Sequence, residues 1–436
     1  MSSFDLLVKN GTLTTSKSRN LFDIGIKDGK IVEIGTITGD AKRVIDASGL
    51  NILPGLIDTQ VHFREPGPTH KEDLESGSRA AALGGICTFF EMPNTSPTTT
   101  TVEKINDKVE LAKSKSHTNF GFYIGGSENN LEELLKAEDL EGCCGVKIFL
   151  GSSTGDLLLY KREVLIEIFK KIKMPIAVHS ESEPRLLDRI SIRDNAKSVH
   201  AHYEWRDAQT ALESTKMIIE VAKEAGRKVH ILHVSTKDEM DYLAKNKEHC
   251  TVEATPQHLT LIAPDAYDQL GAFAQMNPPI RTAEHKEGIW EGLMNGTVDV
   301  LGSDHAPHTI EEKERAYPRS PSGMPGVQTI FPIMLKHMNE GRITLEKIIE
   351  LLSETPAKLY SLNKGRLEVG ADADLTIVDL DKVWTIENED QASKCGWTPF
   401  AGTEVKGKPT ATIVMGQVAM LNDEVFEIKP SPIKRG

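Results

Sequence analysis

The chain has 436 residues, enough for two domains or for one barrel with an appendage. Its net charge of -13 argues against a nucleic-acid partner, because binding to a phosphate backbone depends on clustered lysine and arginine. Hydrophobic residues make up 39% and charged residues 26%, as in an ordinary soluble globular protein, and a small-molecule ligand is easier to accommodate.

The cysteines and the N-terminus indicate the compartment. Five cysteines, without C-x-x-C spacing, fit reduced thiols and not a disulfide framework. The N-terminus lacks the basic region and the long apolar run of a signal peptide, and no stretch has the pattern of a membrane span. We therefore expect a cytoplasmic protein without a membrane partner.

Short strands and tight turns characterise both ends of the chain. The apolar runs at 6–8, 24–26 and 31–34 are separated by Asn10-Gly11 and Asp28-Gly29, which are hairpin signals. The same pattern of short apolar runs recurs at 373–379 and 411–416. Because each half is too small to close a core, we expect residues 1–52 and 361–436 to form one composite β-sandwich domain.

Between these ends, buried strands alternate with helical segments. Periodicity of 3.6 residues is found at 74–83, 102–112, 160–172 and 208–225. Eight strands, most of them followed by a helix, predict an α/β fold, a (β/α)8 TIM barrel over 53–360. The expected strands are 53–57, 86–92, 120–124, 146–150, 176–179, 229–234, 252–255 and 298–302.

Polar residues recur at every second position after the first expected barrel strand. They are Asp58, Gln60, His62 and Arg64. Side chains two residues apart on a strand point to one face. In a barrel, the carboxyl end of each strand faces the mouth where active sites lie, so these residues are expected there.

Five expected strands carry or lead into a group able to bind a metal. These groups are His62, Lys147, His179, His233 and Asp304. A single histidine at a strand end is more often structural than a ligand, but a barrel gathers all its strand ends at one mouth. Imidazole and carboxylate together suit zinc or a related divalent ion, so we expect a metal site.

Lys147 lies inside an apolar strand, where a charged amine would be costly to bury. One interpretation is a lysine that is paired or exposed at the rim. The other is a neutral amine that reacts with carbon dioxide, giving a carbamate whose two oxygens bridge two metal ions. Desolvation lowers the pKa of a lysine and favours that neutral form.

Four motifs are highly specific as a set. They are Val-His-Phe-Arg-Glu-Pro-Gly at 61–67, Glu-Met-Pro-Asn-Thr at 91–95, Met-Asn-Pro-Pro-Ile-Arg at 276–281 and Gly-Ser-Asp-His-Ala-Pro-His at 302–308. The set resembles the dihydroorotases of the amidohydrolase superfamily. The resemblance covers nearly the whole chain, including Gly-Ala-Asp-Ala-Asp-Leu at 370–375.

The resemblance implies a reaction and its cofactor. The reaction is the reversible, metal-dependent hydrolysis of dihydroorotate to N-carbamoyl-aspartate in pyrimidine biosynthesis. The implied cofactor is Zn2+, one or two ions per chain, bridged by carboxylated Lys147. A homodimer is implied as well, and association with a transcarbamoylase is an alternative.

The resemblance also assigns roles to single residues. Asp304 would bind metal and carry the proton between water and the leaving ring nitrogen. Arg64 would hold the substrate carboxylate through two parallel hydrogen bonds. The other expected substrate-binding residues are Asn94, Asn277, His308 and Gly323.

Gln60 departs from the Asp-x-His-x-His pattern of the family. An amide oxygen is a weaker zinc ligand than imidazole, so three outcomes are open: two ions with one held weakly, a single ion, or a non-catalytic subunit. Another cyclic amidohydrolase, an allantoinase or a hydantoinase, is a further alternative, although Arg64 favours a substrate with a carboxylate. The charged loop 309–323 is either a mobile segment over the mouth or a solvated loop.

Overall fold

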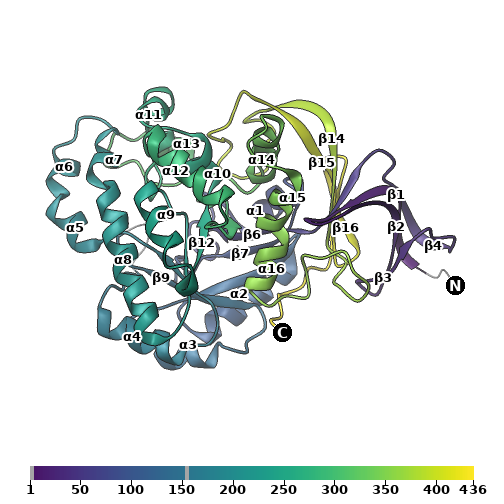
Figure 1. Ribbon diagram of the computed structural model, residues 1–436, viewed down its shortest axis with the longest axis horizontal. Coiled ribbons are helices and arrows are strands. Elements are labelled where there is room, and N and C mark those ends of the chain that lie inside the picture. Colours follow the sequence, from purple (N-terminus) through teal and green to yellow (C-terminus); the bar gives the residue numbers. More distant parts are fainter. Residues whose placement is uncertain (1–3, 153–156) are drawn as a thin grey trace.

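The computed structural model describes residues 4–152 and 157–436, and its centre is a barrel of eight parallel strands (Figure 1). These strands pair in the order of the sequence, and a parallel bridge between Val61 and His305 joins the last strand region to the first. The expected (β/α)8 barrel is confirmed. Its strands are β6 (Leu56–Val61), β7 (Ile86–Glu91), β8 (Asn119–Gly125), β9 (Cys143–Phe149), β10 (Ile176–His179), β11 (Val229–Ile231), β12 (Cys250–Ala254) and β13 (Val300–Leu301).

The expected first barrel strand divides at Gly55. The preceding strand β5 (Asn51–Pro54) pairs with β14 (Leu375–Ile386) of a second sheet, and the barrel strand β6 begins only at Leu56. A Cβ atom at Gly55 would lie 2.6 Å from that of Asp374, so glycine is required where the chain passes between the two sheets.

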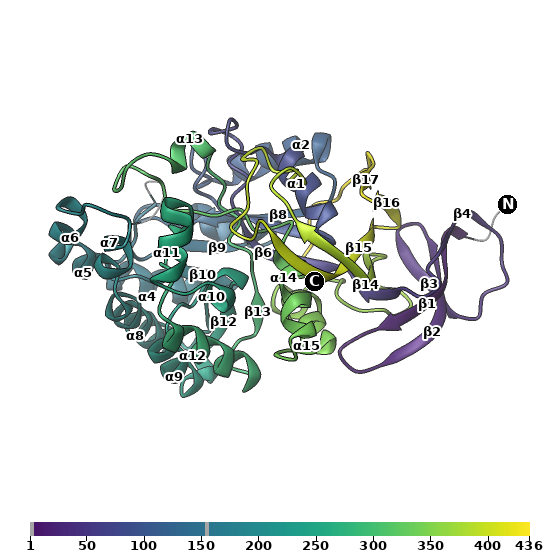
Figure 2. The same ribbon diagram turned by 90° about the horizontal axis from the view of Figure 1, so that it is seen from above.

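Both ends of the chain share that second, nine-stranded sheet, as expected from their short strands. Apolar side chains of both ends form one core, in which Val8 and Ile24 lie with Ile377 and Ile413. The sheet lies beside the barrel, with the N-terminus at its outer end (Figures 1 and 2). Its other strands are β1 (Phe4–Thr14), β2 (Arg19–Lys27), β3 (Lys30–Gly35), β4 (Ala41–Asp46), β15 (Thr403–Val414), β16 (Gln417–Leu421) and β17 (Glu424–Val425).

Helices surround the barrel, and all four segments with helical periodicity are helical. The helices that follow β6 to β10 include α1 (Leu74–Leu83), α2 (Val102–Lys115), α3 (Leu131–Lys136), α4 (Arg162–Lys171), α5 (Glu183–Asp188), α6 (Ile190–Asp194), α7 (Ala201–Trp205) and α8 (Ala208–Ala225). The later ones are α9 (Lys237–Ala244), α10 (Pro256–Thr260), α11 (Asp265–Leu270), α12 (Ala283–Met294), α13 (Ile310–Lys313), α14 (Ile330–Asn339), α15 (Leu345–Ile349) and α16 (Thr355–Leu359). None of the helices within the described ranges is long and apolar enough to cross a bilayer.

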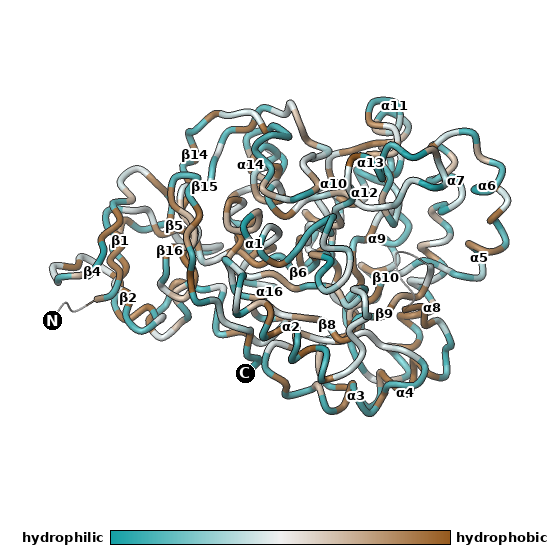
Figure 3. Tube along the Cα trace, turned by 180° about the vertical axis from the view of Figure 1, so that it is seen from behind, coloured by the Kyte–Doolittle hydropathy of each residue, from teal (hydrophilic) through white to brown (hydrophobic). Residues whose placement is uncertain are grey.

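The ends of α1 and α8 follow from local sequence. Asp73 accepts a hydrogen bond from the Ser76 backbone at the start of α1, and Asp207 does the same for the Thr210 backbone at the start of α8. The α8 helix stops at Gly226, whose φ of 64° is left-handed. The apolar faces of α1 and α8 are buried against the barrel. In the second sheet, Figure 3 shows hydrophobic colour along the strands β1 and β5.

Candidate active site

One pair of expected ligand atoms lies between the first and last barrel strands. The Nε2 atom of His62, just after β6, lies 3.3 Å from the Oδ1 atom of Asp304, three residues after β13. The other ring nitrogen of His62, Nδ1, lies 2.7 Å from the amide oxygen of Asn94 and donates to it. The Nε2 lone pair therefore faces a carboxylate, an arrangement that fits a cation held by both atoms.

A second pair lies at the ends of β10 and β11. The Nε2 atom of His179 donates to Glu181 at 2.8 Å, which leaves its Nδ1 lone pair facing the Nε2 atom of His233 at 3.1 Å. Two zinc ligands at ordinary bond lengths and a tetrahedral angle are about 3.3 Å apart. Burial lowers the pKa of both histidines, which keeps them neutral and able to bind metal.

Lys147, in β9, lines the same pocket as both pairs. Its side chain is buried, its Nζ atom lies 4.6 Å from the centre of the Phe149 ring, and burial lowers its pKa to about 7. Across residues 4–152 and 157–436, no three His, Cys, Asp or Glu side chains form a metal cluster by themselves. Each of the two pairs thus needs a further ligand, and a carboxylated Lys147 would supply one to both.

Gln60 also reaches this pocket, from within β6. Its Nε2 atom donates to the Oδ1 atom of Asp304 at 3.0 Å, while its buried Oε1 atom has no hydrogen-bond partner among the described residues. Asp58 lies deeper in the barrel, where the Ser303 backbone donates to it at 3.0 Å and burial raises its pKa to about 7. Of the four alternating polar residues, Gln60, His62 and Arg64 line the pocket, whereas Asp58 lies in the barrel interior and not at the mouth as expected.

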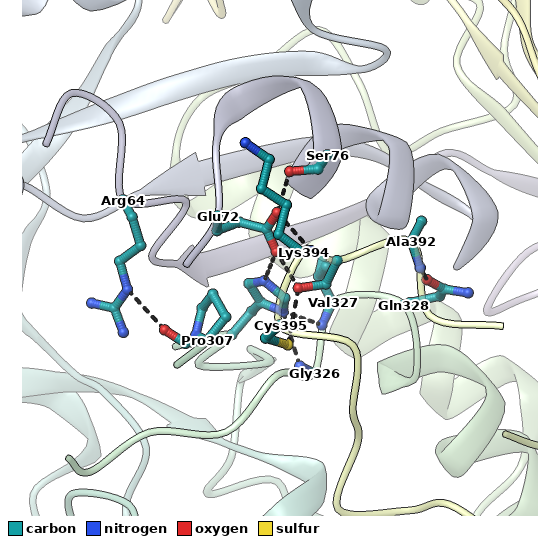
Figure 4. Close-up of polar contacts among 12 residues, drawn as sticks. Arg64, Glu72, Ser76, Pro307, Gly326, Val327, Gln328, Ala392, Lys394 and Cys395 are labelled. Atoms are coloured by element: carbon teal, nitrogen blue, oxygen red, sulfur yellow. Dashed lines mark hydrogen bonds and ion pairs between the residues drawn. The ribbon is translucent and has the colours of Figure 1, made fainter. Parts of the chain in front are cut away.

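Arg64 lines the same pocket as the two expected metal-ligand pairs. Its Nε atom donates to the carbonyl of Pro307 at 3.3 Å (Figure 4), and its guanidinium lies 3.3 Å from the Nε2 atom of His308. Burial lowers its pKa to about 10, so it remains charged at neutral pH. The pocket is lined by Gln60, His62, Arg64, Asn94, Lys147, Phe149, His179, His233, Asn277, Asp304, Ala306, Ser322 and Gly323.

The remaining expected substrate residues are held by neighbours. The amide oxygen of Asn277 lies 3.0 Å from the Nε2 atom of His202. Gly323 packs so closely that a Cβ atom would lie 2.3 Å from the carbonyl oxygen of Ala306. His308 lies one layer behind the lining, in contact with Arg64.

Three of the expected site residues have a left-handed backbone. The φ angles are 64° at Arg64, 37° at His233 and 43° at Asp304. Such angles are uncommon for residues other than glycine and are costly, so the surrounding structure must hold them. Each of them turns the chain where a strand or its extension ends.

The loop 309–323 is anchored at the mouth by the buried amine of Lys313. Its Nζ atom donates to the carbonyl groups of Gln275 at 3.1 Å, Pro321 at 2.9 Å and Gly323 at 3.0 Å. Burial lowers its pKa to about 7. The contacts tie the loop to the chain around Asn277, although its motion stays a prediction.

Sequence reasoning missed Glu181 and Arg206. Glu181 accepts hydrogen bonds from His179 and from the guanidinium of Arg206, which lies over the Trp205 ring. This carboxylate fixes the ring orientation of a proposed ligand. Its position two residues after His179 was the only local signal, whereas nothing in the sequence pointed to Arg206.

Sequence reasoning also missed the contacts of His305, within the fourth motif. Its Nε2 atom lies 3.3 Å from Glu72, and its Nδ1 atom accepts from the Gly326 backbone at 3.0 Å. Figure 4 shows Glu72 between Ser76 and Lys394, whose backbone donates to it at 3.3 Å. The carbonyl of His305 in turn accepts from the His62 backbone at 2.7 Å, so this network supports the expected metal-ligand pair of His62 and Asp304.

Comparisons with known proteins agree with this geometry. A profile described as "Amidohydrolase family" matches residues 51–419. The chain is 37% identical to a dihydroorotase of Methanosarcina mazei, with 97% of this chain and 95% of the relative covered. It is 35% identical to an L-hydantoinase of Paenarthrobacter aurescens, covering 97% and 96%. The solved structure of L-hydantoinase (dihydropyrimidinase) from Arthrobacter aurescens superposes with a TM-score of 0.95 at 33% identity, covering 99% of this chain and 100% of that chain.

Proposed function

Because the chain belongs to the amidohydrolase family, we propose that it is a metal-dependent dihydroorotase. It would interconvert dihydroorotate and N-carbamoyl-aspartate by opening and closing a cyclic amide. Dihydroorotases of archaea at 33–37% identity over nearly the whole chain support this proposal. The reaction places the protein in pyrimidine biosynthesis.

The observation that carries the proposal is the charged guanidinium of Arg64 in the pocket wall. Dihydroorotate bears a carboxylate, and an unsubstituted hydantoin does not. A buried guanidinium without a carboxylate partner would remain uncompensated, whereas a substrate carboxylate can accept two parallel hydrogen bonds from it. No ion pair of Arg64 is found among the described residues, so its charge is available to such a substrate.

The donor set suits one or two Zn2+ ions. His179 and His233 would hold one ion, His62 and Asp304 with the amide oxygen of Gln60 would hold the other, and carboxylated Lys147 would bridge them. Bound zinc supplies Lewis-acid polarisation of the amide and a water of lowered pKa. Glu181 and Asn94 would orient His179 and His62 through their second ring nitrogens.

Asp304 would move the proton in either direction. In ring opening it accepts a proton from water and donates it to the leaving ring nitrogen. The hydrogen bond from the Gln60 amide to its Oδ1 atom leaves the other carboxylate oxygen for this transfer. Arg64 and Asn277 would fix the ring so that its amide faces Asp304.

The experiment is a comparison of three substrates on protein whose metal content has been measured. We expect turnover of dihydroorotate at neutral pH and a much lower kcat/KM with hydantoin and allantoin. A preference for hydantoin would favour the second candidate, a hydantoinase, which the L-hydantoinase relative and the superposed structure support.

A non-catalytic subunit is the candidate from another class. Full metal content without turnover of any of the three substrates, together with co-purification with a transcarbamoylase, would favour it over both enzymes. Homodimer formation stays a prediction, which the mass of the purified protein in solution would test.

A further inference from the structure

Lys71 lies on the segment between the first barrel strand β6 and α1, and it contacts His308, which also contacts Arg64. Its Nζ atom lies 3.0 Å from the Nδ1 atom of His308 and 3.1 Å from a carboxylate oxygen of Glu312. The exposed fractions of the side chains are 16% for Lys71, 13% for Glu312 and 1% for His308. Neither Lys71 nor Glu312 was singled out by the sequence, and the proposed mechanism does not use them.

The contacts of His308 allow two hydrogen-bond networks. In the first, Nδ1 accepts from Lys71 at 3.0 Å and Nε2–H donates to the Ser322 carbonyl at 3.1 Å. In the second, Nε2 accepts from Arg64 at 3.3 Å and Nδ1–H points to Glu312 at 3.6 Å. The distances favour the first network, because 3.6 Å is beyond an ordinary hydrogen bond.

We propose that Lys71 is a positioning residue that holds His308 as the Nε2–H tautomer, so that Nε2 donates to the Ser322 carbonyl and the Arg64 guanidinium keeps its donors for the substrate carboxylate. This inference rests on the proposed function, because it concerns the carboxylate of the same substrate. In the other tautomer the lone pair on Nε2 would accept from Arg64 and occupy a donor that the substrate carboxylate needs.

The charges around His308 agree with this assignment. Burial lowers the pKa of His308 to about 3, so the ring is neutral and one of its nitrogens must be an acceptor. A lysine ammonium has three donors and no acceptor, which makes the nitrogen it faces the acceptor. The Glu312 carboxylate forms an ion pair with the Lys71 amine at 3.1 Å and anchors it beside Nδ1.

The two charged contacts of His308 come from the short helix α13 and from the segment before α1. Glu312 lies within α13, whose first turn is fixed by a capping box between Thr309 and Glu312. Lys71 lies just before α1, and Glu72 next to it binds His305. The adjacent residues Lys71 and Glu72 thus contact two histidines of the motif at 302–308: the Lys71 amine contacts His308, and the Glu72 carboxylate contacts His305.

The first test is nitrogen NMR of the zinc-loaded protein labelled with 15N-histidine, with the His308 signals assigned by their loss in His308→Gln. We expect a protonated Nε2 and an unprotonated Nδ1 at neutral pH in the native chain. The opposite tautomer, or a doubly protonated ring, would overturn the proposal. This readout needs no turnover, so it stands apart from any failure of the dihydroorotase assignment.

The second test is kinetic. In Lys71→Met we expect the KM for dihydroorotate to rise about tenfold, as for a lost charged hydrogen bond, with kcat nearly kept. The kcat/KM for dihydrouracil, which lacks the carboxylate, should not change. Equal losses on both substrates would mean a merely structural role and would overturn the proposal.

Matched variants complete the design. Lys408→Met removes another partly buried lysine with an ion pair, to Asp423 at 2.7 Å in the second sheet, and should leave both substrates unaffected. If Lys71→Met does not fold, Glu312→Gln replaces it: loss of the anchor should raise the KM for dihydroorotate and leave dihydrouracil unchanged. An unchanged KM for dihydroorotate in a folded Lys71→Met would also refute the role.

Discussion

Replacing Lys147 by methionine should raise the stability of the metal-free protein and lower the metal content of the untreated protein. In the metal-free protein the amine is buried without an ion pair among the described residues, and burial lowers its pKa from 10.5 to about 7. Methionine removes this buried amine and keeps a side chain of similar length. The metal-free protein should therefore become more stable.

The magnitude follows from the two pKa values. A difference of 3.5 between 10.5 and about 7 corresponds to about 5 kcal/mol, as an upper value for a fully buried group. The unfolded chain binds a proton between these pH values that the folded chain does not. The loss of folding stability caused by burying Lys147 is thus complete below about pH 7 and disappears as the pH rises toward 10.5. The stability gained by Lys147→Met should therefore shrink over the same pH range.

The assay is chemical denaturation of chelator-treated protein at several pH values, beside metal analysis of untreated protein. We expect higher metal-free stability at neutral pH, convergence with the native chain at high pH, and a lower metal content. In Lys147→Ala, short carboxylic acids should restore part of the metal content and activity. Unchanged metal content and activity in both variants would refute the carbamate, and unchanged metal-free stability would refute the buried amine.

Three further predictions concern the same pocket. Arg64→Ala should lower kcat/KM for dihydroorotate by a factor that corresponds to about 2 to 5 kcal/mol, as for a lost buried charge pair. An equal loss of kcat/KM for hydantoin would contradict the carboxylate role of Arg64. Gln60→His should raise the metal content toward two ions per chain if the amide oxygen is the weak ligand, whereas the same content in both proteins would show that it is not limiting. Glu181→Gln should lower zinc affinity about 10-fold to 100-fold, measured by competition with a chelator, and unaltered affinity would exclude its support of His179.

Local patterns predicted much of this fold. The periodic segment at 74–83 is a helix with those bounds, and the eight buried strands form the expected barrel. The exception is Gly55, where one apolar run serves two sheets, because β5 pairs with β14 and only β6 enters the barrel. Of the two partners of β5, β14 lies more than 300 residues away, so no local pattern identifies it.

The barrel and the residue types at its mouth could be predicted from local rules, namely alternation along a strand and the common direction of parallel strands. Their places in or after the expected strands thus indicated His62, Lys147, His179, His233 and Asp304 before any contact was known. The tertiary structure settled which ring nitrogen of His62 and of His179 is free, since this depends on Asn94 and Glu181. It likewise decided that Lys71 faces His308, because hydrogen bonds between side chains from separate loops depend on angstrom-scale distances that sequence spacing does not encode.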